Sequence, residues 1–83
     1  MRIVISTGAR RDLRRVSREV AVRVAAAIDG LADNPRPPGC LLLRNYDPRT
    51  WRIRVGDWRI LYEIDDEAGA VTAAGIRHRG RAY

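Results

Sequence analysis

The sequence predicts an α+β fold in which two N-terminal helices pack on one face of a twisted, mostly antiparallel sheet. A short β-branched run opens the chain, two helical segments follow it directly, and the second half consists of short strand-like runs separated by turn residues. The predicted order is therefore β-α-α-β-β-β-β. Consecutive helices followed by a strand meander favour segregated helices and strands over a doubly wound parallel sheet.

The first elements are marked by β-branched residues and helix caps. Residues 2–6 (RIVIS) have the composition of a strand. Ser6 or Thr7 is placed to cap a first helix over about residues 8–16. Most of the remaining positions of this helix are basic, so we expect only a narrow apolar edge to face the core.

The second helix is predicted by its apolar spacing. Ser17 is a candidate N-cap, and the helix should run to about Ala32. Its core-facing stripe recurs at intervals of three or four positions, at Val20, Val24, Ile28 and Leu31. Asn34 and Pro35 end the helix, because the residue before a proline is disfavoured in the helical region.

The remaining strands are separated by recognisable turns. Residues 41–45 predict a short strand and residues 46–49 a turn, and 65–69 (DDEAG) predict a second, acidic turn. The last strand is expected over residues 70–77, followed by the basic tail 77–83.

The central feature of the sequence is the stretch Thr50–Ile64 (TWRIRVGDWRILYEI), which reads as a β-hairpin. Gly56 at the first central position of a two-residue connection favours a type II′ turn. Alternation along both strands then divides the side chains between two faces. The predicted apolar face, which the helices should cover, carries Trp51, Ile53, Val55, Trp58, Ile60 and Tyr62.

The opposite face of this hairpin is basic. It carries Arg52, Arg54 and Arg59, and the register puts Arg54 directly across from Arg59. Like charges at opposed positions are destabilising, and a phosphate-rich ligand would offset the repulsion. The alternative interpretation is an ordinary solvated strand face with Glu63 as a nearby counter-charge.

The overall charge points in the same direction. The net charge is +6 on 83 residues, and all 16 basic residues are arginine. Such a balance indicates an anionic partner: nucleic acid, an acidic protein or a membrane surface. Arginine suits bidentate recognition of phosphate, although codon bias in a GC-rich genome would also explain the missing lysines.

Several classes of protein are disfavoured by the same composition. Cys40 is the single cysteine and has no nearby His or Cys in the sequence, so neither an internal disulfide nor a zinc site is expected. Residues 1–83 are expected to form one domain without a signal peptide or a membrane-spanning run of ~20 apolar residues. We therefore expect a cytoplasmic protein.

These segments together resemble the RelE/ParE superfamily of type II toxins, on its RelE-like branch. The resemblance rests on ARRDLRRV, LADNPRPPG, LLLRNY, WRIRVGDWRILYEIDDE and IRHR with a terminal tyrosine, and it covers nearly the whole chain. It implies a small toxin neutralised by a cognate antitoxin. It further implies a ribosome-dependent mRNA endonuclease, or mRNA interferase, whose partners are mRNA and the ribosome, with no metal, other cofactor or membrane.

The resemblance also implies roles for the arginines. Arg52 and Arg54 match basic RNA-binding positions on the strand before the turn. Arg59 matches an arginine that contacts the scissile phosphate, and Arg79 one that stabilises the transition state. Arginine remains protonated, so its task would be to stabilise the dianionic phosphorane rather than to act as a base.

Proton transfer from the 2′-OH falls to His78 or Tyr83. Tyr83 matches the C-terminal tyrosine implicated in this step, and His78 lies where some relatives have a catalytic histidine. An imidazole with an ordinary pKa near ~6.5 is chemically the easier base, whereas a phenol near ~10 needs adjacent cations. Either residue is equally well explained without a catalytic task, as a solvated histidine or a frayed terminus.

Two other functions compete with the nuclease. One is inhibition of DNA gyrase, as in the ParE-like branch, and the other is a basic RNA-binding module or a toxin that has lost activity. The clustering of Arg59, Arg79, His78 and Tyr83 favours phosphate-centred chemistry, which a gyrase inhibitor would not need.

Overall fold

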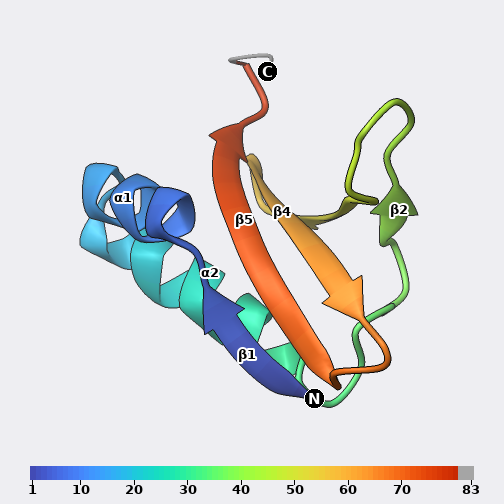
Figure 1. Ribbon diagram of the computed structural model, residues 1–83. Coiled ribbons are helices and arrows are strands. Elements are labelled where there is room, and N and C mark those ends of the chain that lie inside the picture. Colours follow the sequence, from blue (N-terminus) through green and yellow to red (C-terminus); the bar gives the residue numbers. More distant parts are fainter. Residues whose placement is uncertain (81–83) are drawn as a thin grey trace.

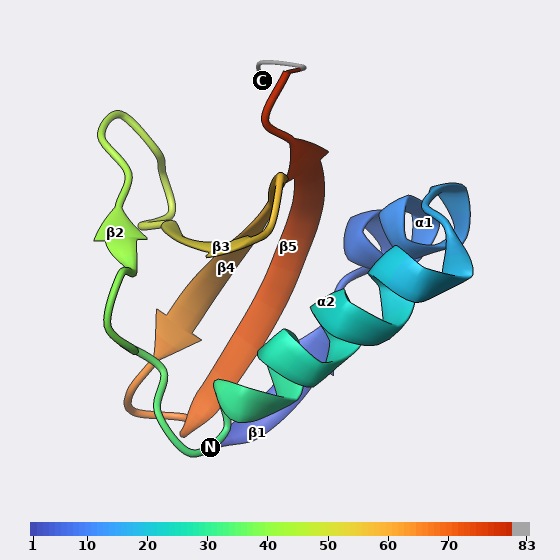
Figure 2. The ribbon, with the colours of Figure 1, turned by 180° about the vertical axis from the view of Figure 1, so that it is seen from behind.

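A computed structural model describes residues 1–80 (Figure 1). The elements are β1 (Arg2–Ile5), α1 (Thr7–Arg15), α2 (Arg18–Gly30), β2 (Leu41–Leu42), β3 (Trp51–Val55), β4 (Trp58–Asp65) and β5 (Ala70–His78). The predicted α+β fold and the order of its elements are confirmed, with both helices on one side of the sheet (Figure 2).

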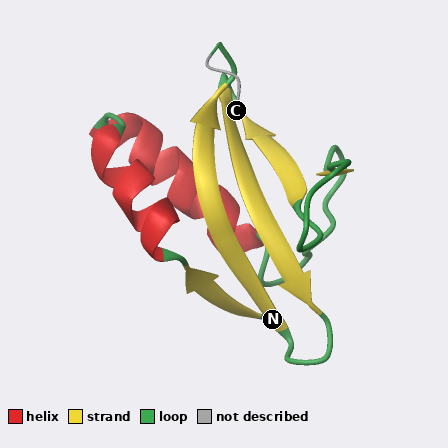
Figure 3. Cartoon of the chain, turned by 45° about the horizontal axis from the view of Figure 1, so that its top comes forward, coloured by secondary structure: helices red, strands yellow, loops and turns green. Residues whose placement is uncertain are grey.

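The sheet has the strand order β1-β5-β4-β3-β2, so the first strand lies beside the last. β1 pairs with β5 in parallel, and all other neighbouring pairs are antiparallel. The sheet twists strongly along its length (Figure 3). β1 covers only the first half of β5, from Ala70 to Ala73, and α1 packs against the remaining half.

Both helices begin at the predicted serine caps. The Ser6 hydroxyl accepts from the Ala9 N–H at 3.0 Å, and the Ser17 hydroxyl accepts from the Val20 N–H at 3.2 Å. Each cap satisfies a donor that the first helical turn leaves without an intrahelical partner.

The second helix ends at Gly30, about two residues earlier than predicted. The next backbone N–H groups bond three residues back, from Leu31 to Ile28 and from Ala32 to Asp29. The chain therefore tightens into a turn before Pro35 instead of continuing as an α-helix.

The core lies between α2 and the covered face of the sheet. Its largest fully buried side chains are Tyr62, Ile28, Leu31, Ile60, Val24 and Val71. The Tyr62 hydroxyl donates to the carbonyl of Pro35 at 2.8 Å, which attaches the loop after α2 to the sheet. Burial raises the pKa of Tyr62 well above its ordinary value, so this phenol stays neutral.

The strand predicted over residues 41–45 is shorter in the structure. Only Leu41 and Leu42 pair with β3, opposite Arg52 and Trp51. Asn45 adopts a left-handed conformation with φ of 62°, which a continuing strand does not permit. The chain closes this loop through the Leu43 N–H, which donates to the Thr50 carbonyl at 2.9 Å.

The central hairpin has the predicted turn and register. Gly56 has a φ of 60°, and Asp57 is not among the residues with positive φ, as a type II′ turn requires. Val55 pairs with Trp58 and Arg54 with Arg59. The predicted division of the hairpin into an apolar and a basic face is therefore confirmed.

Candidate functional site: an arginine face at the tip of the sheet

A row of arginines crosses three neighbouring strands on the side away from the core. Arg54 of β3 is opposite Arg59 of β4, and Arg59 is in turn opposite Arg77 of β5. Arg52 lies two positions from Arg54 on the same face of β3. We call the four residues Arg52, Arg54, Arg59 and Arg77 the arginine face.

The arginine face has an apolar floor. Leu61 points to this side of β4, between Arg52 on one neighbouring strand and Gly75 on the other, yet it is only 5% exposed. The aliphatic stems of long arginine side chains can cover an apolar neighbour, which accounts for the burial of Leu61. The Nε of Arg59 is itself buried. Arg54 is exposed, and Arg52, Arg59 and Arg77 are half-buried.

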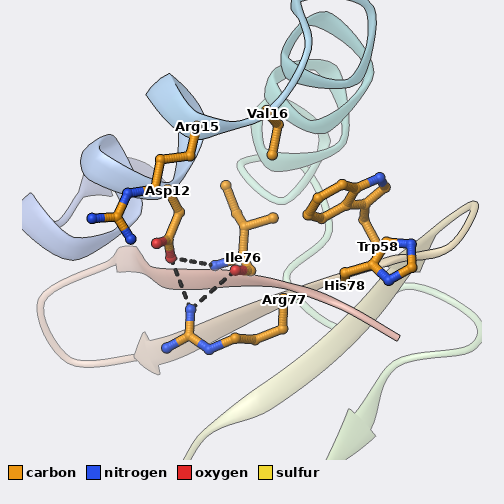
Figure 4. A pocket seen from close by; sticks show the side chains of 7 residues that line it. All are labelled: Asp12, Arg15, Val16, Trp58, Ile76, Arg77 and His78. Carbon is orange, nitrogen blue, oxygen red and sulfur yellow. Dashed lines mark hydrogen bonds and ion pairs between the residues drawn. The ribbon is translucent and has the colours of Figure 1, made fainter. Parts of the chain in front are cut away.

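The guanidinium of Arg77 is held by two acceptors, one in α1 and one in its own strand. Its Nη1 donates to Oδ2 of Asp12 in α1 at 2.8 Å and to the carbonyl of Ile76 at 3.0 Å. The same Asp12 oxygen accepts the Ile76 N–H at 2.9 Å. Figure 4 shows Asp12 at the edge of β5, with the Arg77 and Ile76 side chains on opposite sides of the strand.

Arg79 lies just beyond β5, beside the hairpin turn. Its backbone N–H donates to the Asp57 carbonyl at 2.8 Å, and its Nε is 3.8 Å from Oδ1 of Asp57. Both side chains of this pair are about two-thirds exposed (65% and 66%). Arg79 is therefore close to the tip of the sheet, but Arg77 rather than Arg79 is the register partner of Arg59.

His78 lies on the other face. It pairs in register with Trp58, and the two rings meet edge to face with centroids 5.0 Å apart. Its Nδ1 accepts the Gly80 N–H at 3.2 Å, so the neutral ring carries its hydrogen on Nε2 and presents a donor there. The structure thus does not bring His78 together with the arginine face. Tyr83, the other candidate for proton transfer, lies outside the described residues.

An open pocket of about 690 Å³ lies between α1 and the ends of β4 and β5. Its lining residues are Asp12, Arg15, Val16, Trp58, Ile76, Arg77 and His78. Arg77 lines this pocket and also belongs to the arginine face. The aromatic wall formed by Trp58 and His78 lies on the helix side of the sheet.

The predicted site residues omitted Arg77, although a signal for it was present. Because side chains alternate between the two faces of a strand, Arg77 lies on the same face of the sheet as Arg59, and His78 lies on the same face as Trp58. The sequence did not show the contact between Asp12 and Arg77, because 65 positions separate the two residues in the chain.

Two further findings limit the kinds of site in the described part of the chain. Among residues 1–80, no group of three or more His, Cys, Asp or Glu side chains is arranged to hold a metal ion. No helix within the same range is long and apolar enough to cross a membrane.

The fold and the arginine face define a small basic α+β domain whose exposed sheet surface is suited to anions. The family model for the ParE toxin of the type II toxin–antitoxin system parDE matches residues 3–83. The chain belongs to this family of toxins.

Individual relatives agree with this assignment. The toxin RelG of Mycobacterium tuberculosis is 37% identical over 79 residues, which cover 94% of this chain and 90% of the relative. The RelBE2 toxin–antitoxin complex of the same organism matches with a TM-score of 0.81 and 30% identity, covering 94% of this chain and 96% of that one. The archaeal RelE–RelB complex of Pyrococcus horikoshii OT3 matches with a TM-score of 0.81 at 22% identity, over 98% of this chain and 97% of that one, which supports the fold alone.

Proposed function

We propose that this toxin is a ribosome-dependent mRNA endonuclease that cleaves without a metal ion. The observation that carries the proposal is the row Arg54, Arg59 and Arg77, one residue from each of three adjacent strands. Opposed arginines repel one another, and the ion pair with Asp12 neutralises one member of the row, Arg77. A phosphate chain bound across the row would lower the remaining repulsion. The guanidinium groups of such a row can donate hydrogen bonds to several oxygens of one phosphate and to the adjacent phosphates of the same RNA strand.

The reaction that this surface would serve is attack of a ribose 2′-oxygen on the adjacent phosphorus. A 2′-O–P bond forms, the P–O5′ bond breaks, and the departing 5′-oxygen takes up a proton from water or from the group that accepted the 2′-OH proton. The products are a 2′,3′-cyclic phosphate and a 5′-hydroxyl. The phosphorane formed on the way carries two negative charges. Arg59 and Arg77 would stabilise it, Arg52 and Arg54 would orient the RNA backbone, and Arg79 would add positive charge at the tip.

The 2′-OH proton needs an acceptor that arginine cannot provide. His78 lies on the Trp58 face and its Nδ1 already accepts a backbone N–H, which weakens its case as the base. Tyr83 is therefore the first candidate, and cations of the arginine face would favour its ionised form.

The test of the nuclease is single-turnover cleavage of mRNA on programmed ribosomes, with analysis of the new RNA ends. We expect cyclic phosphate and 5′-hydroxyl ends, and a loss of ~10²-fold or more for Tyr83→Phe, the range for a lost general base. His78→Gln should have the smaller effect. Parental rates in both variants and in the double variant would assign proton transfer to a ribosomal group or to water.

Intact mRNA combined with inhibition of DNA supercoiling by gyrase would replace the nuclease with the ParE-like alternative. If mRNA stays intact and gyrase is not inhibited, the remaining function is RNA binding without catalysis. Both assays use the same purified protein, so their outcomes separate the three functions directly.

The proposed partner in the cell is a cognate antitoxin. The net charge of +6 and the exposed arginine face motivate this proposal, and several similar solved structures are toxin–antitoxin complexes. We expect an acidic, helical antitoxin segment to cover or distort the arginine face. Toxicity that persists during co-expression with every adjacent small acidic protein would contradict this expectation.

A further inference from the structure

The guanidinium of Arg77 is held by groups from two elements, and the proposed reaction does not by itself explain this arrangement. One of the holding groups, Asp12, lies in α1 and thus far from Arg77 in the sequence. The other is the carbonyl of Ile76 in the same strand. The Arg77 side chain is 39% exposed and that of Asp12 only 23%, so the ion pair is partly shielded from solvent.

The contacts with Asp12 and the Ile76 carbonyl leave a defined part of the Arg77 guanidinium available to a ligand. A guanidinium has five N–H donors, two of them on Nη1. Asp12 and the Ile76 carbonyl occupy these two, whereas Nε and Nη2 make no hydrogen bond within residues 1–80. The Nε and Nη2 donors form one edge of the planar fork, and two such parallel donors match two oxygens of a phosphate.

Gly75 provides the space in which the guanidinium lies. A Cβ at this position would be 2.8 Å from Nη1 of Arg77 and 3.2 Å from both Cζ and Nη2. Gly75 does not have a positive φ, so its backbone conformation does not require glycine. The missing side chain therefore makes room for Arg77 against the strand.

We propose that Asp12 and Gly75 are positioning residues for Arg77 that present its Nε/Nη2 edge to a phosphate of single-stranded RNA. This inference rests on the proposed function for the identity of its ligand and extends it to two residues outside the arginine face. A carboxylate near an anion-binding surface repels the ligand by simple electrostatics. Its presence here is explained if orientation of Arg77 outweighs that repulsion.

The first experiment measures binding of a short single-stranded RNA that carries 2′-O-methyl groups and so cannot be cleaved by 2′-oxygen attack. Asp12→Asn keeps an acceptor for the Ile76 N–H but removes the charge that holds Arg77. Gly75→Ala leaves Asp12 intact but displaces the guanidinium. Both variants should weaken RNA binding by about tenfold, the order expected for a lost bidentate charge-assisted contact.

The control for charge is Asp29→Asn. Asp29 is an exposed residue of α2, and the substitution changes the net charge by the same amount as Asp12→Asn. It should leave binding unchanged or make it slightly tighter. A positioning role and a purely electrostatic role for Asp12 thus predict changes of opposite sign.

The decisive comparison repeats both substitutions in an Arg77→Ala background. If Asp12 and Gly75 act through Arg77, neither substitution weakens binding any further once Arg77 is absent. Equal losses in both backgrounds, or tighter binding by Asp12→Asn in the parental background, would overturn the inference. Thermal unfolding of every variant identifies losses that come from a damaged fold, and Gly75→Ala serves as the second route if Asp12→Asn destabilises α1.

Cleavage on ribosomes is then measured with the same set of variants. Suppose that Asp12→Asn and Gly75→Ala weaken RNA binding only when Arg77 is present, but the parental protein cleaves no mRNA. This result would support the positioning of Arg77 and overturn the proposed nuclease. If the parental protein cleaves mRNA but the effects of Asp12→Asn and Gly75→Ala do not depend on Arg77, the nuclease is supported and the positioning of Arg77 is overturned. Absence of RNA binding by the parental protein would overturn the inference itself.

Discussion

The side chains of the β3–β4 hairpin alternate between two faces, and these faces have opposite effects on the stability of the fold. Ile53, Ile60 and Tyr62 point into the core and are buried. On the opposite face, Arg54 and Arg59 stand across from each other, and Leu61 is the buried exception. Burial of apolar area stabilises the first face, whereas repulsion between opposed arginines works against folding on the second.

The comparison explains why stability and activity should respond to different substitutions. A side chain on the covered face contributes to stability through close packing with α2 and β5. The arginines on the open face offer donors to an anion, and one of them, Arg77, also links β5 to α1 through its ion pair with Asp12. Adjacent residues of one strand can therefore be compared directly, one for its effect on stability and the next for its effect on activity.

The largest loss of stability is expected for Ile60→Ala. Ile60 is 0% exposed in the middle of β4, so truncation leaves a cavity in the core. The free energy of unfolding should fall by about 2–5 kcal/mol, as measured by chemical denaturation. Val22→Ala is the matched control, because Val22 is 63% exposed and should change stability little. A small loss for Ile60→Ala would mean that the core lies elsewhere.

The largest loss of activity on the arginine face is expected for Arg59→Ala. Removal of a donor to the phosphorane should lower single-turnover cleavage by ~10²–10³-fold. Stability should stay unchanged or rise slightly, because relief of the repulsion from Arg54 offsets the contacts that Arg59 loses. Arg44→Ala, an exposed loop arginine, controls for the loss of one positive charge. A clear drop in the melting temperature for Arg59→Ala would assign Arg59 a structural role.

A smaller loss of stability is expected for Leu61→Ala, which tests the exception on the arginine face. Leu61 is 5% exposed, but the side chains beside it are flexible arginines that can relax toward the gap. We expect a loss near the lower end of the range for leucine truncation, about 2 kcal/mol. A loss as large as that of Ile60→Ala would show that the arginine face has a rigid core of its own.

The smallest effect is expected for Tyr62→Phe, which removes the hydrogen bond to Pro35 and should cost about 1 kcal/mol near neutral pH. Burial raises the pKa of Tyr62 in the folded state, so above about pH 10 the unfolded state releases this proton more readily. The stabilisation from a neutral Tyr62 is present below that pH and is lost as the pH rises. Denaturation as a function of pH should therefore show a weaker alkaline decline in Tyr62→Phe, whereas Tyr46→Phe, at an exposed position, should leave the decline unchanged.

Much of the fold could be predicted because its signals are local. Ser6 and Ser17 cap their helices as expected, and Gly56 sets a two-residue turn that fixes the register of the hairpin. The limits of β2 and α2 were predicted less well. Their ends depend on the path of the loops that follow, and weak local preferences do not specify such a path.

The candidate site was predictable where it depends on alternation within one hairpin. Arg52, Arg54 and Arg59 follow from a period of two and a single turn. The role of Tyr83 and the division of proton transfer between Tyr83 and His78 stay predictions. The distribution of Arg77, His78 and Arg79 around the tip depends on the pairing of β5 with β4, which the hairpin alone does not determine.

The sequence by itself thus determined the elements, the hairpin register and the basic face, because each depends on residues a few positions apart. Only the tertiary structure decided that β1 lies parallel to β5 and that α1 continues along the edge β1 leaves open. That packing brings Asp12 to Arg77 across 65 positions of the chain. Contacts of this range depend on how amphipathic surfaces close on one another, and no local pattern of residue types encodes them.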